Sequence, residues 1–516
     1  MNPQPIRFYH RGALVEVNGA HPTRSVLDWL REDARCTGTK EGCNEGDCGA
    51  CTVVIGELAQ PGDTSAVRGL SLQTVNACIQ FLPTLHGKAL FTVEDLKAPD
   101  RLHPTQQAMV ECHGSQCGFC TPGFVMSLWS TYEHHQACNT RPSRQQLADD
   151  LSGNLCRCTG YRPILDAGQR MFDLPAATLD TAPVVAALQG LQADQGLHYV
   201  AVNRQVEGSP QRVDHFHAPR TLEALATLRE AHPQAQLLAG STDVGLWVNK
   251  QFKQLGDIVY VGDVEELKRI EEKDGELLIG AGASLEAAWR TLVQRLPSLT
   301  DVWLRFASPP IRNAGTMGGN VANGSPIGDS PPVLMALDAQ IVLRNGARVR
   351  RVPLHEFYLD YMKNQLQPGE FVLAMAVPLP AFERQVRAYK ISKRFDCDIS
   401  ALCAGLSIEL DGDVVKQVRI AFGGMAGTVK RAAAAEAVLT GQAWTQASVK
   451  LAQAALAQDF KPLSDMRASA AYRLQVAQNL LQRFWLETRS QDALPPQATS
   501  VWSTMAHAEL SVEGTP

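Results

Sequence analysis

Residues 41–53 read EGCNEGDCGACTV, which places three cysteines and three glycines in one short segment ahead of an apolar run. With a distant fourth cysteine, the thiols have the spacing C-x4-C-x2-C and are Cys43, Cys48, Cys51 and Cys78. This spacing is the ligand pattern of plant-type [2Fe–2S] clusters. Glycines at 42, 46 and 49 let the backbone curl around a cluster and direct N–H groups at its sulfurs. The segment therefore predicts an iron–sulfur site.

A structural zinc site with four thiolates is the alternative for these cysteines. Zinc usually takes two compact C-x2–4-C pairs, whereas here three cysteines share one loop and the fourth lies on another element. The spacing favours iron–sulfur over zinc. Cys36 lies outside the pattern, and we expect it to be an ordinary packed cysteine.

A second set of cysteines follows in GSQCGFCTPG and NLCRCTGYRP, and it consists of Cys117, Cys120, Cys156 and Cys158. Both pairs precede a predicted helix, and helix N-termini present unpaired N–H groups and partial positive charge that stabilise an anionic cluster. The pairs predict a second four-thiolate site. Zinc is a stronger alternative here than at the first set, because two close pairs suit it.

Composition limits the classes of function. The length of 516 residues suggests about three domains. The chain has 48 Lys and Arg against 53 Asp and Glu, and no cluster of basic residues in the sequence is dense enough to bind a nucleic acid backbone. No apolar run approaches the roughly 18–20 residues of a membrane span, and the N-terminus lacks the apolar core of a signal peptide. We therefore expect a cytoplasmic protein with reduced thiols that bind metal, and no nucleic acid or membrane as partner.

The order of patterns along the chain predicts its domains. IRFYHRGALVEVNG has the arms of a hairpin, SVLDWLRED begins a helix with Ser25 as N-cap, and CTVVIG is a strand. From about residue 105, apolar residues at three- and four-residue spacing predict four helices, with Pro122 and Pro163 at first helical positions. A stretch without periodicity predicts a linker over 173–212, and strands and helices alternate beyond it. The tail from 489 to 516 is expected to be poorly ordered.

The runs CHGSQCGFCTPGFVMS and LSGNLCRCTGYRPI, which follow a plant-type cluster loop, closely resemble the molybdenum hydroxylases, the xanthine dehydrogenase and aldehyde oxidase family. The resemblance implies that each set of four cysteines holds one [2Fe–2S] cluster. It also implies that Gln116 touches the pterin of a molybdenum cofactor bound by a separate domain.

Two small-residue stretches extend the resemblance to a flavin domain. LLAGSTDVG at 237–245 and AGTMGGNVANGSPIGD at 314–329 could each cradle a diphosphate with backbone N–H groups, although glycine-rich turns alone are weak evidence. The residues that the resemblance assigns to FAD are Leu237, Leu238, Ala239, Gly240, Ser241, Thr242, Asp243, Val244, Phe306, Thr316, Met317, Gly318, Gly319, Asn320, Asp329 and Lys390. LLIGAGASLEAAW, by contrast, lacks the third glycine and the βαβ context of a dinucleotide fingerprint, so it is read as a structural turn.

The expected fold is α+β and multidomain. It consists of a ferredoxin-like β-grasp [2Fe–2S] domain (1–92), a four-helix [2Fe–2S] domain (93–172), the linker (173–212), an α+β FAD-binding domain (213–384), an α+β C-terminal domain of the flavoprotein (385–488) and the tail (489–516).

The resemblance also implies a role in electron transfer. The family hydroxylates substrates at a molybdenum centre, and we expect that centre on a large molybdopterin-binding partner subunit, in an α2β2 assembly. Electrons from hypoxanthine or xanthine would pass through the two clusters to FAD and then to NAD. One departure concerns the acceptor: in KRFDCDIS, Phe395 and Cys397 replace polar or charged residues of many relatives in the loop near the flavin.

Another molybdenum hydroxylase, acting on an aldehyde or an N-heterocycle, and a molybdenum-independent NAD(P)H reductase stay open as alternatives. A third alternative, a zinc-stabilised scaffold without redox chemistry, would give a colourless protein.

Overall fold

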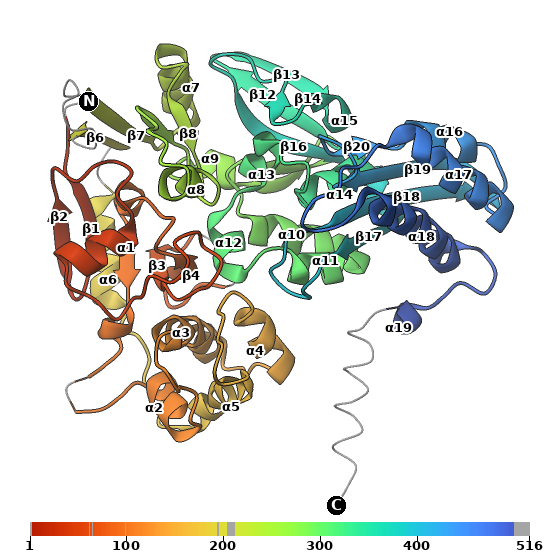
Figure 1. Ribbon diagram of the computed structural model, residues 1–516. Coiled ribbons are helices and arrows are strands. Elements are labelled where there is room, and N and C mark those ends of the chain that lie inside the picture. Colours follow the sequence, from red (N-terminus) through yellow and green to blue (C-terminus); the bar gives the residue numbers. More distant parts are fainter. Residues whose placement is uncertain are drawn as a thin grey trace, which may run out of the picture. The chain divides into compact units, whose positions relative to one another are not determined.

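The computed structural model describes residues 3–60, 62–63, 65–98, 100–192, 196–203 and 212–499. The chain forms two compact units (Figure 1). Unit 1 comprises residues 1–266, 284–286 and 308–316, and unit 2 comprises residues 267–283, 287–307 and 317–516. Each unit combines helices and sheets, so the predicted α+β multidomain class is confirmed.

Unit 1 begins with a five-stranded sheet in the order β2-β1-β5-β3-β4. Its strands are β1 (Ile6–His10), β2 (Ala13–Val17), β3 (Thr52–Leu58), β4 (Leu70–Asn76) and β5 (Ala89–Phe91). β1 pairs with β2 as the predicted hairpin and runs parallel to β5. The Ser25 side chain caps α1 (Val26–Asp28) by accepting the Asp28 N–H, as predicted, and the helix continues as a π-helix (Trp29–Asp33).

Four helices follow where the apolar spacing predicts them: α2 (Pro104–Glu111), α3 (Thr121–Cys138), α4 (Arg144–Asp150) and α5 (Arg162–Arg170). Pro122 and Pro163 each lie second in their helix, one residue later than predicted, where a missing N–H is still harmless. In α3 every residue from Gly123 to Glu133 is buried, because the other helices and the first sheet of unit 1 pack around it.

The stretch 173–212, predicted as a linker, contains regular structure. It includes α6 (Ala182–Leu191) and β6 (Gly196–Asn203), and β6 pairs residue by residue with β7 (Arg212–Pro219). The prediction of an irregular stretch was therefore wrong. α6 buries only three side chains, at 184, 188 and 191, and β6 is an edge strand, so neither shows a strong apolar period.

The rest of unit 1 is a second sheet in the order β6-β7-β9-β8, with β8 (Gln236–Leu238) and β9 (Ile258–Tyr260). Its helices are α7 (Leu222–Ala231), α8 (Val244–Asn249) and α12 (Pro309–Ala314). The short α9 (Glu265–Lys268) lies where the chain passes from unit 1 to unit 2. A core shared by the two sheets includes Phe8, Trp29, Phe81, Phe216 and Tyr260.

Unit 2 contains a five-stranded sheet, a two-stranded sheet and a four-stranded sheet. The first has the order β10 (Ile270–Lys273), β11 (Glu276–Gly280), β16 (Phe371–Pro378), β12 (Gln340–Asn345) and β13 (Arg348–Pro353), and the second pairs β14 (Tyr358–Asp360) with β15 (Lys363–Asn364). The third has the order β17 (Gln385–Ile391), β18 (Leu402–Asp411), β19 (Val414–Gly423) and β20 (Lys430–Arg431).

Helices cover these sheets, and most belong wholly to unit 2. They are α10 (Leu285–Arg295), α11 (Thr300–Arg305), α13 (Met317–Asn323), α14 (Ser330–Ala336), α15 (Leu354–Phe357), α16 (Ala433–Leu439), α17 (Gln446–Asp459), α18 (Ala470–Thr488) and α19 (Pro496–Thr499). α16, α17 and α18 close a core over β18 and β19 that includes Phe422, Trp444, Phe460 and Phe484. Of the predicted poorly ordered tail, residues 500–516 lie outside the described residues.

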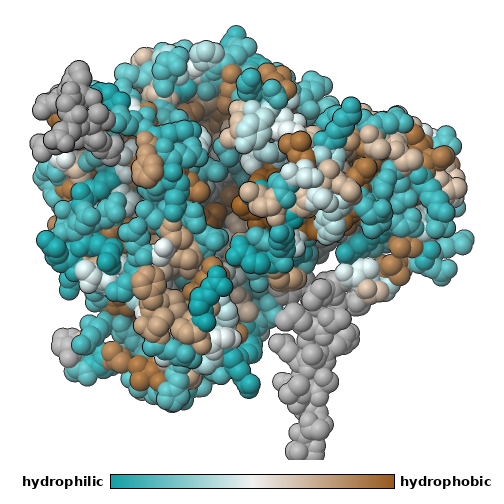
Figure 2. Space-filling view, in the orientation of Figure 1, coloured by the Kyte–Doolittle hydropathy of each residue, from teal (hydrophilic) through white to brown (hydrophobic). Residues whose placement is uncertain are grey.

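The described helices include none long and apolar enough to cross a membrane. The face of the molecule in Figure 2 is largely hydrophilic, with apolar residues scattered over it.

Candidate iron–sulfur and flavin sites

The first cysteine set gathers around the loop that precedes β3. The Cys48 N–H donates to Cys43 Sγ at 3.4 Å, and Cys51 and Cys78 are buried and in side-chain contact. The hydrogen bond from the Cys48 thiol, and then the N–H groups of residues 45, 48 and 47, lower the pKa of Cys43 to about 5 against the effect of burial. A sulfur surrounded by N–H donors is the environment that a cluster thiolate needs.

The glycines of this loop are required by space and by backbone conformation. A Cβ at Gly42 would lie 2.8 Å from Cys48 Sγ, so a side chain there would displace a thiol. Gly46 and Gly49 have φ of +80° and +68°, which L-residues rarely adopt. Asn76 holds the turn by donating to the Gly46 carbonyl at 2.7 Å.

The second cysteine set gathers where α3 begins and where the chain approaches α5. Cys158 Sγ lies 3.7 Å from Cys117 Sγ and 3.8 Å from Cys156 Sγ, and Cys120, which caps α3, contacts Cys156. Four thiols are thus brought to one place from two loops. Gln116, predicted to touch a pterin, is exposed beside the exposed Cys117.

Hydrogen bonds to sulfur distinguish Cys156, which is buried, from Cys120, which is half-buried. Burial raises the pKa of Cys156, but hydrogen bonds from the Thr159 hydroxyl and from the N–H groups of Thr159 and Cys158 outweigh burial and bring it to about 6. Burial, and then Cys156, raise the pKa of Cys120 to about 12. Cys156 therefore has the donors that stabilise a thiolate ligand.

A short hydrogen-bonded connection, which no spacing or motif predicts, links the two sets. The Leu155 N–H donates to the Cys48 carbonyl at 3.0 Å, so the neighbour of Cys156 is bonded directly to a residue of the first set. Asn154, which is buried, donates to the Gly49 carbonyl at 3.0 Å and to Thr52 Oγ1 at 3.1 Å.

The residues predicted to bind FAD are divided between the two units. Those at 237–244 and Thr316 belong to unit 1, and Phe306, those at 317–320, Asp329 and Lys390 belong to unit 2.

In unit 1, the turn between β8 and α8 lies against the end of α12. A Cβ at Gly240 would lie 1.8 Å from the Ala314 carbonyl oxygen, so only glycine fits. Ser241 has φ of +63° and is 3% exposed, and its hydroxyl has no hydrogen-bond partner among the described residues. A buried hydroxyl without a partner costs free energy, so this turn fits a polar ligand such as a flavin nucleotide.

In unit 2, the glycine-rich α13 packs on the turn that follows β11, which the sequence predicts to be a structural turn. The N–H groups of Met317 and Gly318 donate to the carbonyls of Ala283 and Ala281 at 2.9 Å each. These two N–H groups are thus already used. The Asn320 Oδ1, which is buried and lacks a partner in the described part of the chain, is the group of this stretch left to meet a ligand.

Lys390 forms a buried ion pair with a predicted flavin residue. Its Nζ donates to Asp329 Oδ2 and to Ser400 Oγ at 2.7 Å each, and Ser400 donates to Asp329 Oδ1 at 2.7 Å. Phe306 lies at the end of α11, with its ring 5.9 Å from that of Trp289. The assignment of these residues to FAD stays a prediction.

Arg305, which the sequence did not single out, holds the loop 392–400. Its Nε donates to the Phe395 carbonyl at 3.0 Å, its guanidinium lies 4.6 Å from the centre of the Phe395 ring, and it also donates to the carbonyl of Lys390. The Cys397 thiol donates to the Ala307 carbonyl at 3.4 Å. An arginine gives no distinctive pattern in a sequence, which is why spacing could not reveal this contact.

Comparison with known proteins identifies the domains in the predicted order. Profiles match a 2Fe-2S iron–sulfur cluster binding domain at residues 8–82, a [2Fe-2S] binding domain at 92–169, the FAD binding domain of molybdopterin dehydrogenase at 211–380 and the C-terminal domain of the CO dehydrogenase flavoprotein at 387–488. Together the four matches support the molybdenum hydroxylase resemblance that the cysteine motifs indicate.

The curated relatives that the chain matches are two to three times longer than the chain. Xanthine dehydrogenase of Emericella nidulans is 31% identical over 94% of this chain and 39% of its own length, and that of Drosophila subobscura is 32% identical over 82% and 34%. Aldehyde oxidase 1 of Rattus norvegicus is 30% identical over 86% and 36%. The chain therefore spans little more than a third of each of these relatives.

Two iron–sulfur domains and a flavin domain are thus present, as the sequence predicted. The iron–sulfur domains each contain one group of four thiols, so iron–sulfur is favoured over zinc at both. The individual ligands and the exact domain boundaries stay predictions.

Proposed function

We propose that the chain is the small subunit of a bacterial-type xanthine dehydrogenase, and that it carries electrons from a partner's molybdenum cofactor through two [2Fe–2S] clusters to FAD and then NAD. The substrates would be hypoxanthine and xanthine, oxidised to urate in the cytoplasm. The partner would be a large molybdopterin-binding subunit in an α2β2 assembly.

The observation that carries the proposal is the pair of four-thiol groups within one unit, joined by the hydrogen bond from Leu155 to Cys48. Clusters supply one-electron transfer, and a flavin exchanges single electrons for a hydride. The protein's part is to hold two such centres at fixed separation. Asn154 does this from one side through Gly49 and Thr52.

Exposure supports the direction of electron entry. Cys117 of the second set and its neighbour Gln116 are exposed. By contrast, Cys51 and Cys78 of the first set are only 2% and 1% exposed. A partner's cofactor can approach the second set more closely, so that set is the entry point and the first set lies further along.

At the other end, the loop 392–400 would meet the acceptor. Arg305 fixes it through Phe395, and the backbone of Cys397 has φ of +52°. A loop held in this way presents a defined surface to a nicotinamide nucleotide.

The test begins with native purification. We expect a co-purifying large chain with molybdenum, iron and labile sulfide for two [2Fe–2S] clusters per small chain, FAD, and purine-dependent formation of NADH. A complex without molybdenum would contradict the partner, and a complex that reduces NAD with no purine would contradict the substrate.

A matched pair of variants separates the two ends of the chain. Gln116→Glu should slow purine-dependent reduction of NAD while leaving NADH-dependent reduction of a dye unchanged, because Gln116 lies only at the entry side. Gln192→Glu, also at an exposed position of unit 1, should change neither rate. Equal loss of both rates in Gln116→Glu would contradict the role of Gln116.

An aldehyde-oxidising member of the family is the second candidate, since the rat aldehyde oxidase is about as similar as the xanthine dehydrogenases. Turnover with aldehydes but not with purines in the same purified complex would select it. A molybdenum-independent NAD(P)H reductase would instead show full activity as the isolated chain.

A further inference from the structure

Three histidines of unit 1 lie on one face of two neighbouring strands. In the antiparallel register of β6 and β7, His198 is opposite His217, and His215 is two residues earlier on β7. The intervening Phe216 faces the core, so the histidines occupy the opposite face of the sheet. One ring nitrogen from each of the three lies within 4.8 Å of the others.

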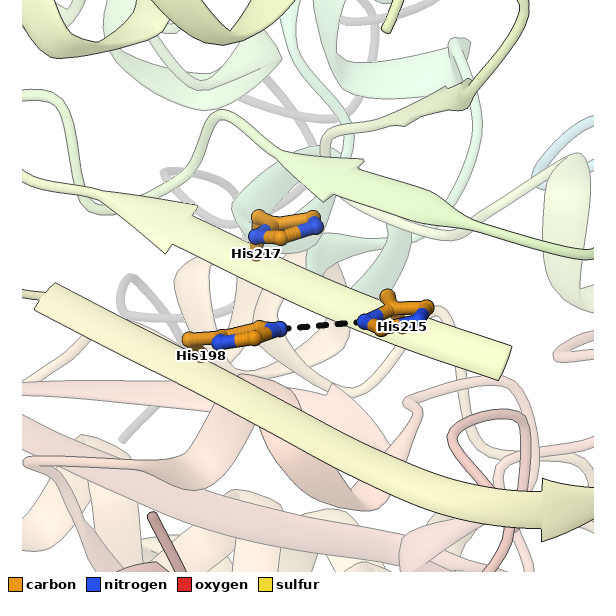
Figure 3. Close-up of side chains that lie close together, drawn as sticks. All are labelled: His198, His215 and His217. Atoms are coloured by element: carbon orange, nitrogen blue, oxygen red, sulfur yellow. Dashed lines mark hydrogen bonds between the residues drawn. The ribbon is translucent and has the colours of Figure 1, made fainter. Parts of the chain in front are cut away.

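The rings are stacked and nearly parallel, and they come from both strands (Figure 3). The His198 and His217 centroids are 4.6 Å apart at an interplanar angle of 5°, and His198 Nε2 lies 3.1 Å from His215 Nδ1. The torsion that turns an imidazole about its Cβ–Cγ bond is soft, so the rings can rotate toward a shared ion without movement of the strands.

His217 has a buried nitrogen that is left without a hydrogen bond. The residue is 8% exposed, and its Nε2 has no partner among the described residues. An unpaired buried donor or acceptor costs about 1–3 kcal/mol, so the site is incomplete without a ligand.

We propose that His198, His215 and His217 bind one divalent transition-metal ion, such as Zn²⁺, at a site distinct from the cysteine clusters. Three neutral imidazoles are a donor set that zinc, copper and nickel accept, with further positions left for water. The proton in the His198–His215 hydrogen bond moves to another ring nitrogen or to solvent when the metal binds.

The surroundings are compatible with a cation. Asp257 approaches from the start of β9: its Oδ1 accepts the His215 backbone N–H at 2.9 Å, and its charge favours positive charge at His217. His232, at the end of α7, lies with its ring 5.3 Å from that of His217 and is placed to contact a metal-bound water. Because the three ligands come from two strands, the ion would pin the edge strand β6 to β7.

The test uses untagged, fully cluster-loaded protein, so that neither a histidine tag nor empty cysteine sites compete for zinc. Equilibrium dialysis against Zn²⁺ with metal analysis should give one bound equivalent. The double variant His198→Gln/His215→Gln changes only partly exposed side chains and should lose this equivalent, with Zn²⁺ affinity weakened by more than about tenfold. The control His355→Gln, at an exposed histidine of unit 2, should retain it.

Thermal unfolding gives a second readout. Added Zn²⁺ should raise the unfolding temperature of unit 1 in the wild type and in His355→Gln, because a ligand that binds the folded state stabilises it. In the double variant, added Zn²⁺ should leave this temperature unchanged. Equal zinc content in all three proteins, or no zinc bound by the wild type, would overturn the proposal. Because cluster content and purine turnover are measured separately, failure here would leave the proposed function untouched.

Discussion

Lys390 is buried and joins segments that are far apart in the sequence. It lies on β17, while Asp329 precedes α14 and Ser400 precedes β18, and all three meet through hydrogen bonds of 2.7 Å. The Lys390 side chain is 1% exposed. At such a position the removal of one partner leaves the other charge unpaired in the interior.

Lys390→Met should therefore destabilise unit 2 by about 3–5 kcal/mol, because Asp329 would remain buried without its cation. The control Lys416→Met removes an exposed ion pair with Glu409 and should change stability little. Denaturant unfolding measures both variants. Similar midpoints for Lys390→Met and wild type would mean that Asp329 finds another partner.

His103 makes the stability of the helical domain depend on pH. Its Nε2 donates to the Ala177 carbonyl at 2.9 Å and its Nδ1 accepts the Thr105 N–H, while burial lowers its pKa to about 4 from an ordinary value of 6.5. Between these two values the unfolded chain binds the proton and the folded chain does not. Stability therefore falls as the pH decreases from about 6.5 to about 4.

His103→Gln should weaken the pH dependence of the free energy of unfolding. The contribution of His103 to this free energy changes by at most about 3 kcal/mol between pH 6.5 and pH 4. The exposed His113→Asn, in the same domain, should leave the slope as in wild type. The unfolding midpoint is measured from pH 4 to pH 8 for all three proteins. An unchanged slope in His103→Gln would show that another group titrates there.

The predictability of single residues depended on what kind of interaction they make. The ligand cysteines could be predicted because a cluster requires a characteristic spacing of its ligands. The need for glycine at Gly42 could be predicted because this residue directly precedes Cys43 in the cluster loop. Arg305 and Asn154 could not, since one arginine or asparagine among many has no pattern until the chain folds. Neither could the unpaired hydroxyl of Ser241, which is a property of the surrounding packing.

Among the elements, the approach of the loop 153–156 to the loop 48–52 decides how the two cysteine sets are spaced. A Cβ at Gly49 would lie 2.3 Å from the Gly153 carbonyl, and one at Gly123 would lie 2.1 Å from the Gly49 carbonyl. The loops therefore touch through bare backbone. Asn154 fills the remaining space and also accepts the Ser127 hydroxyl at 2.6 Å.

Asn154→Ala should separate these loops. It leaves buried hydrogen-bonding groups unpaired at a cost of about 1–3 kcal/mol each, so the unit 1 transition should move to lower temperature and iron should be lost more readily. Asn18→Ala, at an exposed asparagine that donates to Glu16 at 3.4 Å, is the control. Iron content after mild heating and calorimetry report the effect. Wild-type iron retention in Asn154→Ala would contradict it.

Periodic elements were predictable, and elements defined by their neighbours were not. The hairpin of β1 and β2 and the helices α2 to α5 follow from apolar residues at strand or helix spacing, although α3 is buried on all sides from Gly123 to Glu133. α6 and β6 were missed since one buries few side chains and the other is an edge strand. The two sheets of unit 1 share a core that no local pattern can show.

In the whole molecule, the eight predicted ligand cysteines all belong to unit 1, while α16 to α18 build a separate core in unit 2. Removal of iron should therefore affect the two units differently. Metal binding to a folded site contributes directly to its stability.

Chelation of iron under reducing conditions should lower the unfolding temperature of unit 1 and leave that of unit 2 unchanged. Differential scanning calorimetry before and after chelation measures both transitions, and a mock-treated sample is the control. A parallel shift of both transitions would contradict independent units, and no shift would contradict metal binding by the cysteines.

Unit 1 is not continuous in the chain, and this affects the order of events during synthesis. α12, at residues 309–314, packs on β4: Asn313 donates to the Thr74 carbonyl at 3.1 Å, and a Cβ at Gly46 would lie 3.1 Å from Ile311. A ribosome must therefore translate beyond the first stretch of unit 2 before the cysteine loops gain their final cover. A nascent chain that stalls earlier would expose the first set of thiols to solvent and oxidants. The first cluster can therefore be fully covered only after residues 309–314 have been translated.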